Sequence, residues 1–500
     1  MLKLLHFQLY GGYMDKFISE LKKISVEDLI YKFSEISIEM FNNKHSCMKK
    51  IPVYVTRYGI PQEKELLLTS WDIPNIEYLS IIYSSDYRKS MDVLSMQNLI
   101  NAYRRFDNEH SIASEIANTD MAGIFRIFIG MTAEQFRHQN LKWIFERFNR
   151  NYYMLVEAKH LEHQKDIDVF SAVKNTFGYS MDDYIAMLLM VYWLCSKHPD
   201  PLTAPEHIYR KKDSTIFTKD NITRFVEYYS CTYEDLRNSP LGKQLLYSKP
   251  FIKTNQGNEY LASCIQLIMM LVADGLYWIV RDYYPKRYPK ENQKFPNVFG
   301  LLFEDYIKDL AATYCDPAKY ICLPQGKRKG ADYLFDFDTM KMIVESKSSM
   351  IRLDAKQQVP NMQSIDNFLK RAIKEAYEQL NKSYYKLRDS TDLPIMKVVL
   401  LYDEFSNTAI IEKSIPEIFE VDSCVFVMTI RQFEILLYYH QHDKEKFQLL
   451  INKFIASMNS KVPVSNIDAI YDDMEIYDNP HIDKMRYFEK AMNHMKNNLS

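Results

Sequence analysis

The stretch that decides the fold of the C-terminal half is Ala331-Asp-Tyr-Leu-Phe-Asp-Phe-Asp338, followed closely by Lys341-Met-Ile-Val-Glu-Ser-Lys347. Both segments are short and rich in aromatic and aliphatic residues, so together they predict a β-hairpin. A hairpin would bring the Asp332 carboxylate close to Glu345. Lys347 would share the strand face of Glu345, because strand side chains alternate. Paired carboxylates are protein ligands that Mg²⁺ prefers, so the hairpin predicts a divalent-cation site.

The elements on either side of the hairpin alternate between helices and short strands. We expect a helix from Phe299 to about Tyr314, strands at Tyr320–Pro324, Asp332–Phe337 and Lys341–Ser348, a long helix at Ile365–Lys386, strands at Met396–Tyr402 and Cys424–Thr429, and a helix from Arg431. This order predicts an α/β sandwich built on a mixed sheet.

Three motifs in this region carry a family resemblance. Glu304 lies in Phe299-Gly-Leu-Leu-Phe-Glu-Asp-Tyr, Asp332 lies in Lys329-Gly-Ala-Asp-Tyr, and Glu345 with Lys347 lies in Val344-Glu-Ser-Lys. An acid on the first helix, then an acid and an acid-x-lysine on the hairpin, resembles the PD-(D/E)xK nuclease superfamily, which has the restriction-endonuclease-like fold. The resemblance covers Phe299 to about His440, and Ala331 stands where the family name has proline.

The resemblance implies a metal centre on the hairpin. Asp332 and Glu345 would ligate Mg²⁺ or Mn²⁺, and the main-chain carbonyl of Ser346 would be a third protein ligand. Lys347 would position and help deprotonate the attacking water, or neutralise charge that builds up on the phosphate. Glu304 would complete the water network or a second metal site.

Further residues are predicted to face a nucleic acid. Lys327, Arg328 and Lys329 come just before Asp332, where basic side chains attract a phosphate backbone that carboxylates alone would repel. The resemblance adds Gln379, which occupies the position of a site-facing glutamine in many members of the superfamily. The expected partner is therefore nucleic acid, with DNA preferred.

The structural alternative for Asp332, Glu345 and Lys347 is a solvated sheet edge or a salt bridge. Glu345, however, directly follows the apolar run Met342–Val344, which is typical of a buried strand. An unpaired acid in such a strand would be costly to bury. Together with an acid on the preceding helix, this position favours a functional site.

A second basic cluster precedes the predicted sandwich. Its members are Arg281, Lys286, Arg287, Lys290 and Lys294, with Tyr283, Tyr284 and Tyr288 interleaved. The prolines within this stretch favour a linker between two domains. The cluster would either extend the nucleic-acid track by charge and stacking or form a solvated linker.

The residues before the sandwich predict helices, with a strand at Ile51–Thr56 and helices that open at Thr218 and Thr232. The predicted organisation is a mostly helical region 1–165, a helical middle region 166–296 ending in the basic linker, a nuclease-like domain 297–445 and a helical extension 446–500. The fold class is therefore α+β overall, with an α/β sandwich in the C-terminal part.

Composition limits the classes of protein. The net charge is −2, so any contact with nucleic acid must come from a local patch. The seven cysteines include no Cys-x-x-Cys pair, which argues against a disulfide framework and a zinc site and favours a cytoplasmic protein. The apolar runs are too short to predict a membrane span. His160 and His163 are expected on a charged helix, where a solvated face is favoured over a zinc site.

The sequence thus favours a metal-dependent nuclease that hydrolyses phosphodiester bonds with Mg²⁺ or Mn²⁺. By analogy alone, its context would be antiphage defence, restriction or repair. The alternative is a non-catalytic nucleic-acid-binding or scaffold subunit of a multiprotein defence complex, and a nuclease acting on RNA is a third option. A homo-oligomer or a protein partner is expected, because cutting both strands of a duplex commonly takes two active sites.

Overall fold

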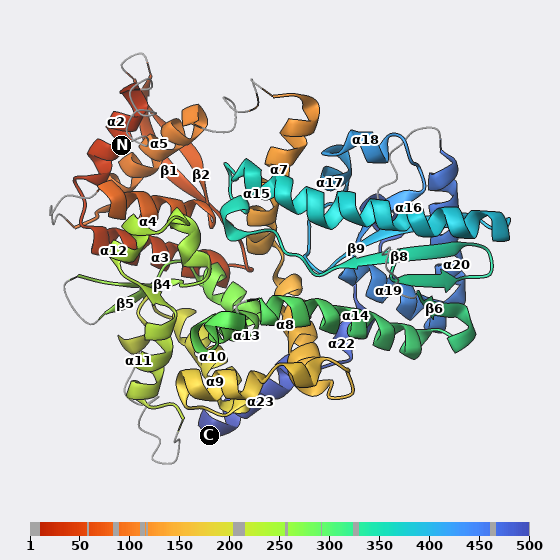
Figure 1. Cartoon of the computed structure of the whole chain (residues 1–500). Coiled ribbons are helices and arrows are strands. Elements are labelled where there is room, and N and C mark those ends of the chain that lie inside the picture. Colours follow the sequence, from red (N-terminus) through yellow and green to blue (C-terminus); the bar gives the residue numbers. More distant parts are fainter. Residues whose placement is uncertain are drawn as a thin grey trace.

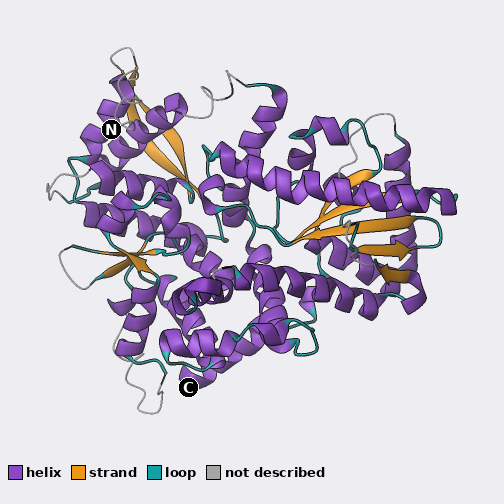
Figure 2. Cartoon of the chain, viewed as in Figure 1, coloured by secondary structure: helices purple, strands orange, loops and turns teal. Residues whose placement is uncertain are grey.

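A computed structural model of the chain describes residues 11–57, 60–83, 90–110, 116, 119–203, 216–255, 259–291, 293–323, 330–460 and 467–499. A sandwich of strands and helices forms one side of the molecule, and a larger body of helices forms the other (Figure 1). Within the described residues the strands gather in three separate sheets (Figure 2). The predicted α+β class, with a mostly helical N-terminal part, is confirmed.

The largest sheet belongs to the C-terminal half and has the strand order β10-β9-β8-β7-β6. Its strands are β6 (Tyr320–Cys322), β7 (Tyr333–Asp336), β8 (Lys341–Lys347), β9 (Ile395–Leu401) and β10 (Val425–Thr429). The pairs β6–β7 and β7–β8 are antiparallel, whereas β8–β9 and β9–β10 are parallel. The predicted hairpin and the predicted mixed sheet are therefore both present.

Helices cover both faces of this sheet. Ile343 and Val399 face α15 (Met362–Phe368), the π-helical turn η9 (Leu369–Lys374) and α16 (Glu375–Leu387). Val344 and Val398 lie on the opposite face, in the core shared with α14 (Lys294–Tyr314) and α19 (Ile430–His442). Alternating apolar side chains of the central strands thus fill two separate cores, as a sheet buried on both faces requires.

The remaining C-terminal helices extend from the sandwich back to the helical body. They are α17 (Ala409–Lys413), α18 (Pro416–Phe419), α20 (Lys444–Asn459), α21 (Ile467–Asp473), α22 (Pro480–Asp483) and α23 (Tyr487–Leu499). On α23, the Phe488 ring packs edge-on against Phe145, with ring centroids 4.7 Å apart. In its described residues, 446–460 and 467–499, the extension is largely helical as predicted, and its last helix docks on the N-terminal region.

The helical body is built from α2 (Gly11–Leu21), α3 (Val26–Asn42), α4 (Asp72–Tyr83), α5 (Val93–His110), α7 (Met121–Gln139), α8 (Leu141–Tyr152), α9 (Val169–Phe177), α10 (Met181–Cys195), α11 (Lys219–Tyr228), α12 (Tyr233–Asn238) and α13 (Ile265–Arg287). Thr218 and Thr232 cap α11 and α12 as predicted, each accepting a main-chain N–H bond from the residue three positions on.

Two features of the helical body differ from the sequence prediction. The strand expected at Ile51–Thr56 is β1 (Met48–Arg57), but it pairs with an unpredicted strand, β2 (Ile60–Thr69). A small sheet of β3 (Ser230–Cys231), β4 (Phe251–Lys253) and β5 (Tyr260–Ala262) was also missed.

The stretch from Arg281 to Lys294, which was predicted to be a linker, is instead largely helical. Helix α13 continues through Pro285 to Arg287, and α14 already begins at Lys294. Between them lies a single 3₁₀ turn, Pro289–Glu291. Pro285 lacks the main-chain N–H that would bond to the Arg281 carbonyl, and α13 ends two residues after it.

Two buried arginines of α8 join the helical body to the sandwich. Arg150 donates through Nε and Nη2 to the two carboxylate oxygens of Glu434 on α19, at 2.7 and 2.8 Å, and through Nη1 to Glu404 at 3.2 Å. Arg147 donates through Nε to Asp274 on α13 at 2.7 Å, within the helical body, and its Nη1 lies 4.0 Å from Oδ1 of Asp403, which follows β9. Both arginine side chains are completely buried. Removing their charges from water is costly, and the ion pairs with these carboxylates offset that cost.

The division into four regions remains a prediction, although α14 begins within three residues of the proposed start of the nuclease-like domain at 297. Among the described helices, none combines the length and the apolar character that a membrane span requires.

We predict that Glu434→Gln destabilises the protein by about 3–5 kcal/mol, because the charge of Arg150 would remain buried with only Glu404 opposite it. Denaturant unfolding monitored by circular dichroism would measure the change. The control is Glu420→Gln, which alters an exposed acid and should shift stability by less than about 0.5 kcal/mol. Equal effects in the two variants would contradict the proposed importance of the pair.

Candidate metal and catalytic centre at the carboxyl edge of the sheet

The hairpin places Asp332 opposite Glu345. Tyr333 pairs with Val344, so the next position along the antiparallel ladder sets Asp332 against Glu345. The main-chain N–H of Asp332 donates to the Val344 carbonyl at 2.9 Å, which fixes this register at the end of β7. Because β8 and β9 are parallel, both carboxylates lie at the edge where these strands end, a common location of ligand sites in sheets with parallel strands.

Ser346 holds the Asp332 side chain in place. Its main-chain N–H and its hydroxyl both donate to Asp332 Oδ2, at 2.8 and 2.7 Å. Carbonyl groups alternate in direction along a strand, so the Ser346 carbonyl points to the same side as that of Val344, toward the residues that precede β7. This direction is the one required of a carbonyl that serves as a ligand beside Asp332.

The loop that leads into Asp332 is anchored on α16. The main-chain N–H of Ala331 donates to the Ser383 hydroxyl at 2.9 Å. A β-carbon at Gly330 would lie only 2.8 Å from the same hydroxyl oxygen, so the close approach depends on glycine. Ser383 and Gly330 therefore fix the position from which Asp332 reaches the sheet edge.

Glu345 has the environment of a ligand that is ready for a cation. Its side chain is 3% exposed, and its Oε1 contacts Lys347 Nζ at 2.5 Å. Its Oε2 is buried, and no group in the described part of the chain donates a hydrogen bond to it. Burial, and secondly the Asp332 carboxylate, raise the pKa of Glu345 to about 8, against the opposing effect of Lys347. A buried carboxylate oxygen without a partner is costly unless a cation or a proton satisfies it.

Lys347 shares a strand face with Glu345, as predicted. Its side chain is 18% exposed, so the ammonium lies between the buried carboxylate and solvent. Its main-chain carbonyl accepts from Tyr402 N at 3.0 Å, which fixes the end of β8 to β9. A fixed cation at this edge can meet an anionic substrate as it approaches the carboxylates.

Glu304 approaches from the opposite face of the sheet. The Tyr333 hydroxyl donates to the main-chain carbonyl of Glu304 at 2.8 Å, which ties α14 to the residue next to Asp332. Partial burial, and secondly the charge of Asp332, raise the pKa of the Glu304 carboxyl. The helix acid expected from the sequence is therefore close enough to Asp332 for their charges to interact.

The donor set fits a hard divalent cation. Two facing carboxylates, an unpartnered buried carboxylate oxygen and a main-chain carbonyl are oxygen ligands of the kind that Mg²⁺ and Mn²⁺ take. The residues Asp332, Glu345 and Ser346 would hold the ion, with Glu304 and Lys347 beside it.

Two other predictions have different outcomes. The Gln379 side-chain amide donates to the Glu375 carbonyl one turn earlier on α16, at 3.3 Å, and among the described residues no hydrogen bond joins it to the hairpin. Lys327, Arg328 and Lys329 lie outside the described residues, so their prediction as a nucleic-acid contact stays untested.

A turn before α9 also reaches α14 beside Glu304, which the sequence prediction missed. His163 Nδ1 lies 2.9 Å from Asp305 Oδ2, and His160 Nε2 lies 2.9 Å from Asp309 Oδ1. The two histidines lie in this turn and not on the expected helix. The main-chain N–H of His163 also donates to Asp305 Oδ2 at 2.9 Å, so hydrogen bonds account for the contact between Asp305 and His163 without a bound metal.

The segment that follows β8 is fixed by a second unpredicted contact. Asp403, two residues beyond β9, accepts from Ile351 N at 3.0 Å and from Lys356 Nζ at 2.8 and 3.1 Å. On the other side of this segment, Gly130 of α7 lies so close that a β-carbon would come within 2.4 Å of the Ala355 carbonyl oxygen. The strand that carries Glu345 and Lys347 is thus continuous with a segment clamped between β9 and the helical body.

Comparisons of the chain with protein families, curated proteins and solved structures return no match. Its function must therefore be inferred from the residues of this centre.

We predict that Glu345→Gln stabilises the metal-free protein increasingly as the pH rises from 4.5 to 8. The folded protein keeps the Glu345 proton up to a pKa of about 8, whereas the unfolded chain releases it near 4.5. The contribution of Glu345 to the free energy of unfolding is therefore fully present below pH 4.5. It falls by about 1.4 kcal/mol per pH unit as the pH rises from there to the folded pKa.

Unfolding in a chelator at several pH values, for both proteins, measures this difference. Glu63→Gln, which changes an exposed acid on β2, should give a difference from wild type that does not vary over the same range. A pH-independent difference for Glu345→Gln would disprove the burial argument.

Proposed function

We propose that this protein is a metal-dependent nuclease that hydrolyses phosphodiester bonds, with DNA as the preferred substrate. The observation that carries the proposal is the facing pair Asp332 and Glu345, with one buried oxygen of Glu345 unsatisfied by the described residues and Lys347 next to it. A structural salt bridge between Glu345 and Lys347 alone would leave that oxygen unexplained.

The fold supports the same proposal. A mixed sheet, covered by α14 and α19 on one face and by α15 and α16 on the other, agrees with the resemblance to the PD-(D/E)xK superfamily. The acid-x-lysine lies at the carboxyl end of β8, with the first acid on the adjacent end of β7. The family resemblance itself remains part of the proposal.

Each residue has a definite part in the proposed reaction. When bound, Mg²⁺ would act as a Lewis acid on the scissile phosphate and favour ionisation of a water molecule. Asp332 and Glu345 supply its carboxylate ligands, and the Ser346 hydroxyl keeps Asp332 oriented through its bond to Oδ2. Lys347 carries the positive charge that offsets the charge developing on the phosphate, and it orients the attacking water. Glu304 accepts a hydrogen bond from that water.

We predict that Glu345→Ala, Asp332→Ala and Lys347→Ala each lower Mg²⁺-dependent cleavage by about a hundredfold or more, because each removes a group that acts on the reacting phosphate. Cleavage would be followed on linear, circular and single-stranded DNA and on RNA, with and without Mg²⁺. Lys370→Ala and Asp338→Asn change exposed charges on η9 and in the hairpin turn and should cleave like wild type. Unchanged cleavage in all three hairpin variants would refute the proposal.

We also predict that wild-type protein binds Mn²⁺ and that Asp332→Asn and Glu345→Gln abolish this binding, because each removes a carboxylate ligand. Isothermal titration calorimetry measures the affinity directly and does not depend on the choice of nucleic-acid substrate. Asp338→Asn should bind as wild type does. If Mn²⁺ does not bind at all, a non-catalytic subunit becomes the better assignment.

A further inference from the structure

The strongest unassigned feature is a cavity among α9, α11 and the end of α13. It measures about 540 Å³ and is lined by Asn175, Thr176, Tyr228, Asp282, Tyr283, Lys286 and Arg287. Sites for small ligands commonly measure roughly 300–1,000 Å³. None of the lining residues belongs to the hairpin centre. The part of α14 from Lys294 to Glu304 alone spans about 15 Å of helix between the two places.

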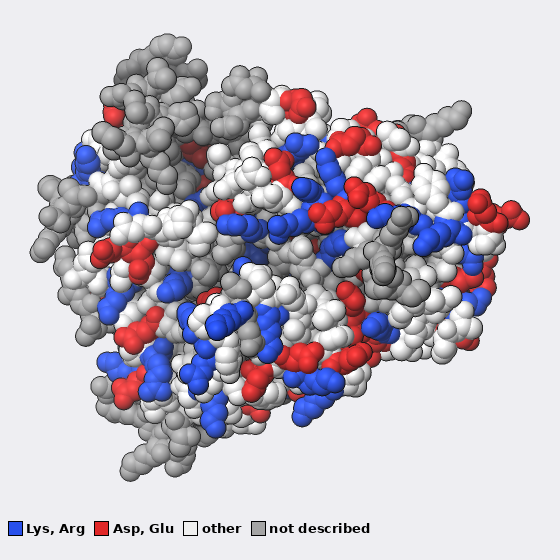
Figure 3. All heavy atoms as spheres, in the orientation of Figure 1, with Lys and Arg blue, Asp and Glu red and all other residues white. Residues whose placement is uncertain are grey.

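The cavity contains two cations for which the described residues show no salt bridge, Lys286 and Arg287, and both side chains are exposed. The Asp282 carboxylate, one helical turn before Lys286, offsets part of the Lys286 charge. The ammonium of Lys286 lies 5.7 Å from the centroid of the Tyr228 ring. Basic side chains gather over this part of the surface, around α9, α10 and α13 (Figure 3). An anion entering the cavity would therefore meet positive charge on two sides.

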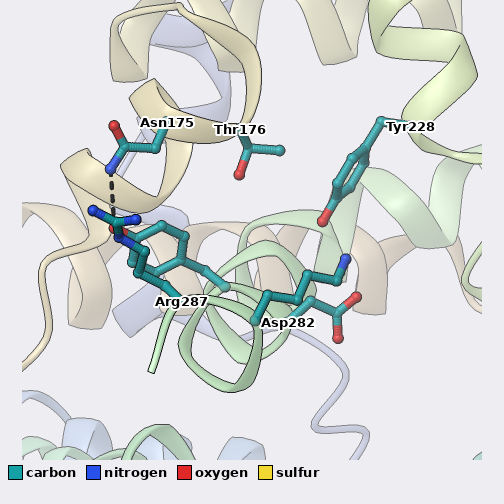
Figure 4. A pocket seen from close by; sticks show the side chains of 7 residues that line it. Asn175, Thr176, Tyr228, Asp282 and Arg287 are labelled. Atoms are coloured by element: carbon teal, nitrogen blue, oxygen red, sulfur yellow. Dashed lines mark hydrogen bonds between the residues drawn. The ribbon is translucent and has the colours of Figure 1, made fainter. Parts of the chain in front are cut away.

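One structural reason for these cations is their place in the last turn of α13, where positive charge is favourable. The helix end explains why positive charge is favoured at these two positions. It does not explain the open space between α13, α9 and α11. Figure 4 shows Tyr228 and Arg287 on opposite sides of this space, with the Thr176 hydroxyl directed into it.

The two tyrosines are held in fixed positions. Asn175 Nδ2 donates to the Tyr283 hydroxyl at 2.9 Å. The Tyr228 ring packs edge-on against Phe177 and Tyr229, each at a centroid distance of 4.9 Å. Rings fixed in this way lose little freedom when a planar group stacks on them, which favours binding of an aromatic base.

The lining is rich in donors and contains a single carboxylate, that of Asp282. Lys286, Arg287, the amide of Asn175 and the hydroxyl of Tyr228 can donate to phosphate oxygens, whereas the Thr176 hydroxyl donates to the Ala172 carbonyl at 2.7 Å. Asp282 can accept from a sugar hydroxyl or from an amino group of a base. Inorganic phosphate would use only the cations, and a neutral aromatic molecule would use only the rings. A nucleoside phosphate uses every group.

From this arrangement we infer that the cavity binds a nucleoside phosphate, with the phosphate at Lys286 and Arg287 and the base against Tyr228. This nucleoside phosphate is either a free mononucleotide or the phosphorylated end of a nucleic-acid strand. The cavity thus constitutes a second ligand site, and its occupancy does not depend on cleavage at the hairpin.

The test is binding of the full-length protein in EDTA, so that metal-dependent cleavage cannot consume the probe. The ribonucleoside 5′-monophosphates are titrated one at a time, beside inorganic phosphate, adenosine and a 5′-phosphorylated DNA tetranucleotide. We expect the monophosphates to bind more tightly than inorganic phosphate or adenosine, because only they engage cations and ring together. Tighter binding of the tetranucleotide than of the monophosphates assigns the site to a strand end, and equal or weaker binding assigns it to a free nucleotide.

The double variant Lys286→Ala/Arg287→Ala should weaken binding by about tenfold to a hundredfold, because it removes the charge-assisted bonds to the phosphate. The matched control is Lys16→Ala/Lys197→Ala, which removes the same charge from exposed positions outside the cavity and should bind as wild type does. Absence of binding by any nucleotide probe, or equal binding by the two double variants, overturns the inference. Because the readout is binding without metal, a failed nuclease assay would leave this result unaffected.

Discussion

The rest of the structure depends on the burial of Arg150 between Glu434 and Glu404. A guanidinium that is completely removed from water is tolerated only when carboxylates meet it with good geometry. Here the carboxylates come from α19 and from the segment after β9, whereas the arginine comes from α8. The three elements must therefore be in place together, and the helical body and the sheet form a continuous core.

This constraint determines what surrounds the hairpin centre. The carboxyl ends of β8 and β9 point toward the helical body, where Met350 after β8 and Asp403 after β9 both meet Arg147 of α8. Asp403 illustrates the result, because it binds the segment after β8 and lies 4.0 Å from Arg147 of α8. The helical part thus supports the strand edge at which Glu345 and Lys347 are displayed.

The relative positions of Asp332, Glu345 and Lys347 could be predicted from the strand pattern of a short stretch of sequence. Strand alternation puts Glu345 and Lys347 on one face, and hairpin pairing brings Asp332 opposite, so residues within a short stretch of sequence were sufficient. The partner of Arg150 could not be found in this way. Glu434 is 284 residues away, and the sequence gives the sign of a charge without its partner. The same limit concealed the contact between His163 and Asp305.

Two elements, β2 and the end of α13, were predicted wrongly because their local residue composition is unusual for a strand or a helix. Strand β2 begins Ile60-Pro-Gln-Glu-Lys-Glu, a polar run that lacks the alternation expected of a strand, yet it pairs with β1 along its whole length. The prolines near Tyr284 suggested a linker, but the last turn of α13 accommodates Pro285. Both errors arise because tertiary pairing and position within a helix override local propensity.

The contribution of α8 has a consequence for how such a protein can change over evolutionary time. The hairpin centre is not a portable module, since a fragment limited to 297–445 would lack both arginines that meet Asp403, Glu404 and Glu434. Recombination that replaced the first part of the chain wholesale would leave those carboxylates without their cations. Exchange of segments in the helical body is therefore confined to regions that leave α8 intact, so the hairpin and this one helix are inherited together.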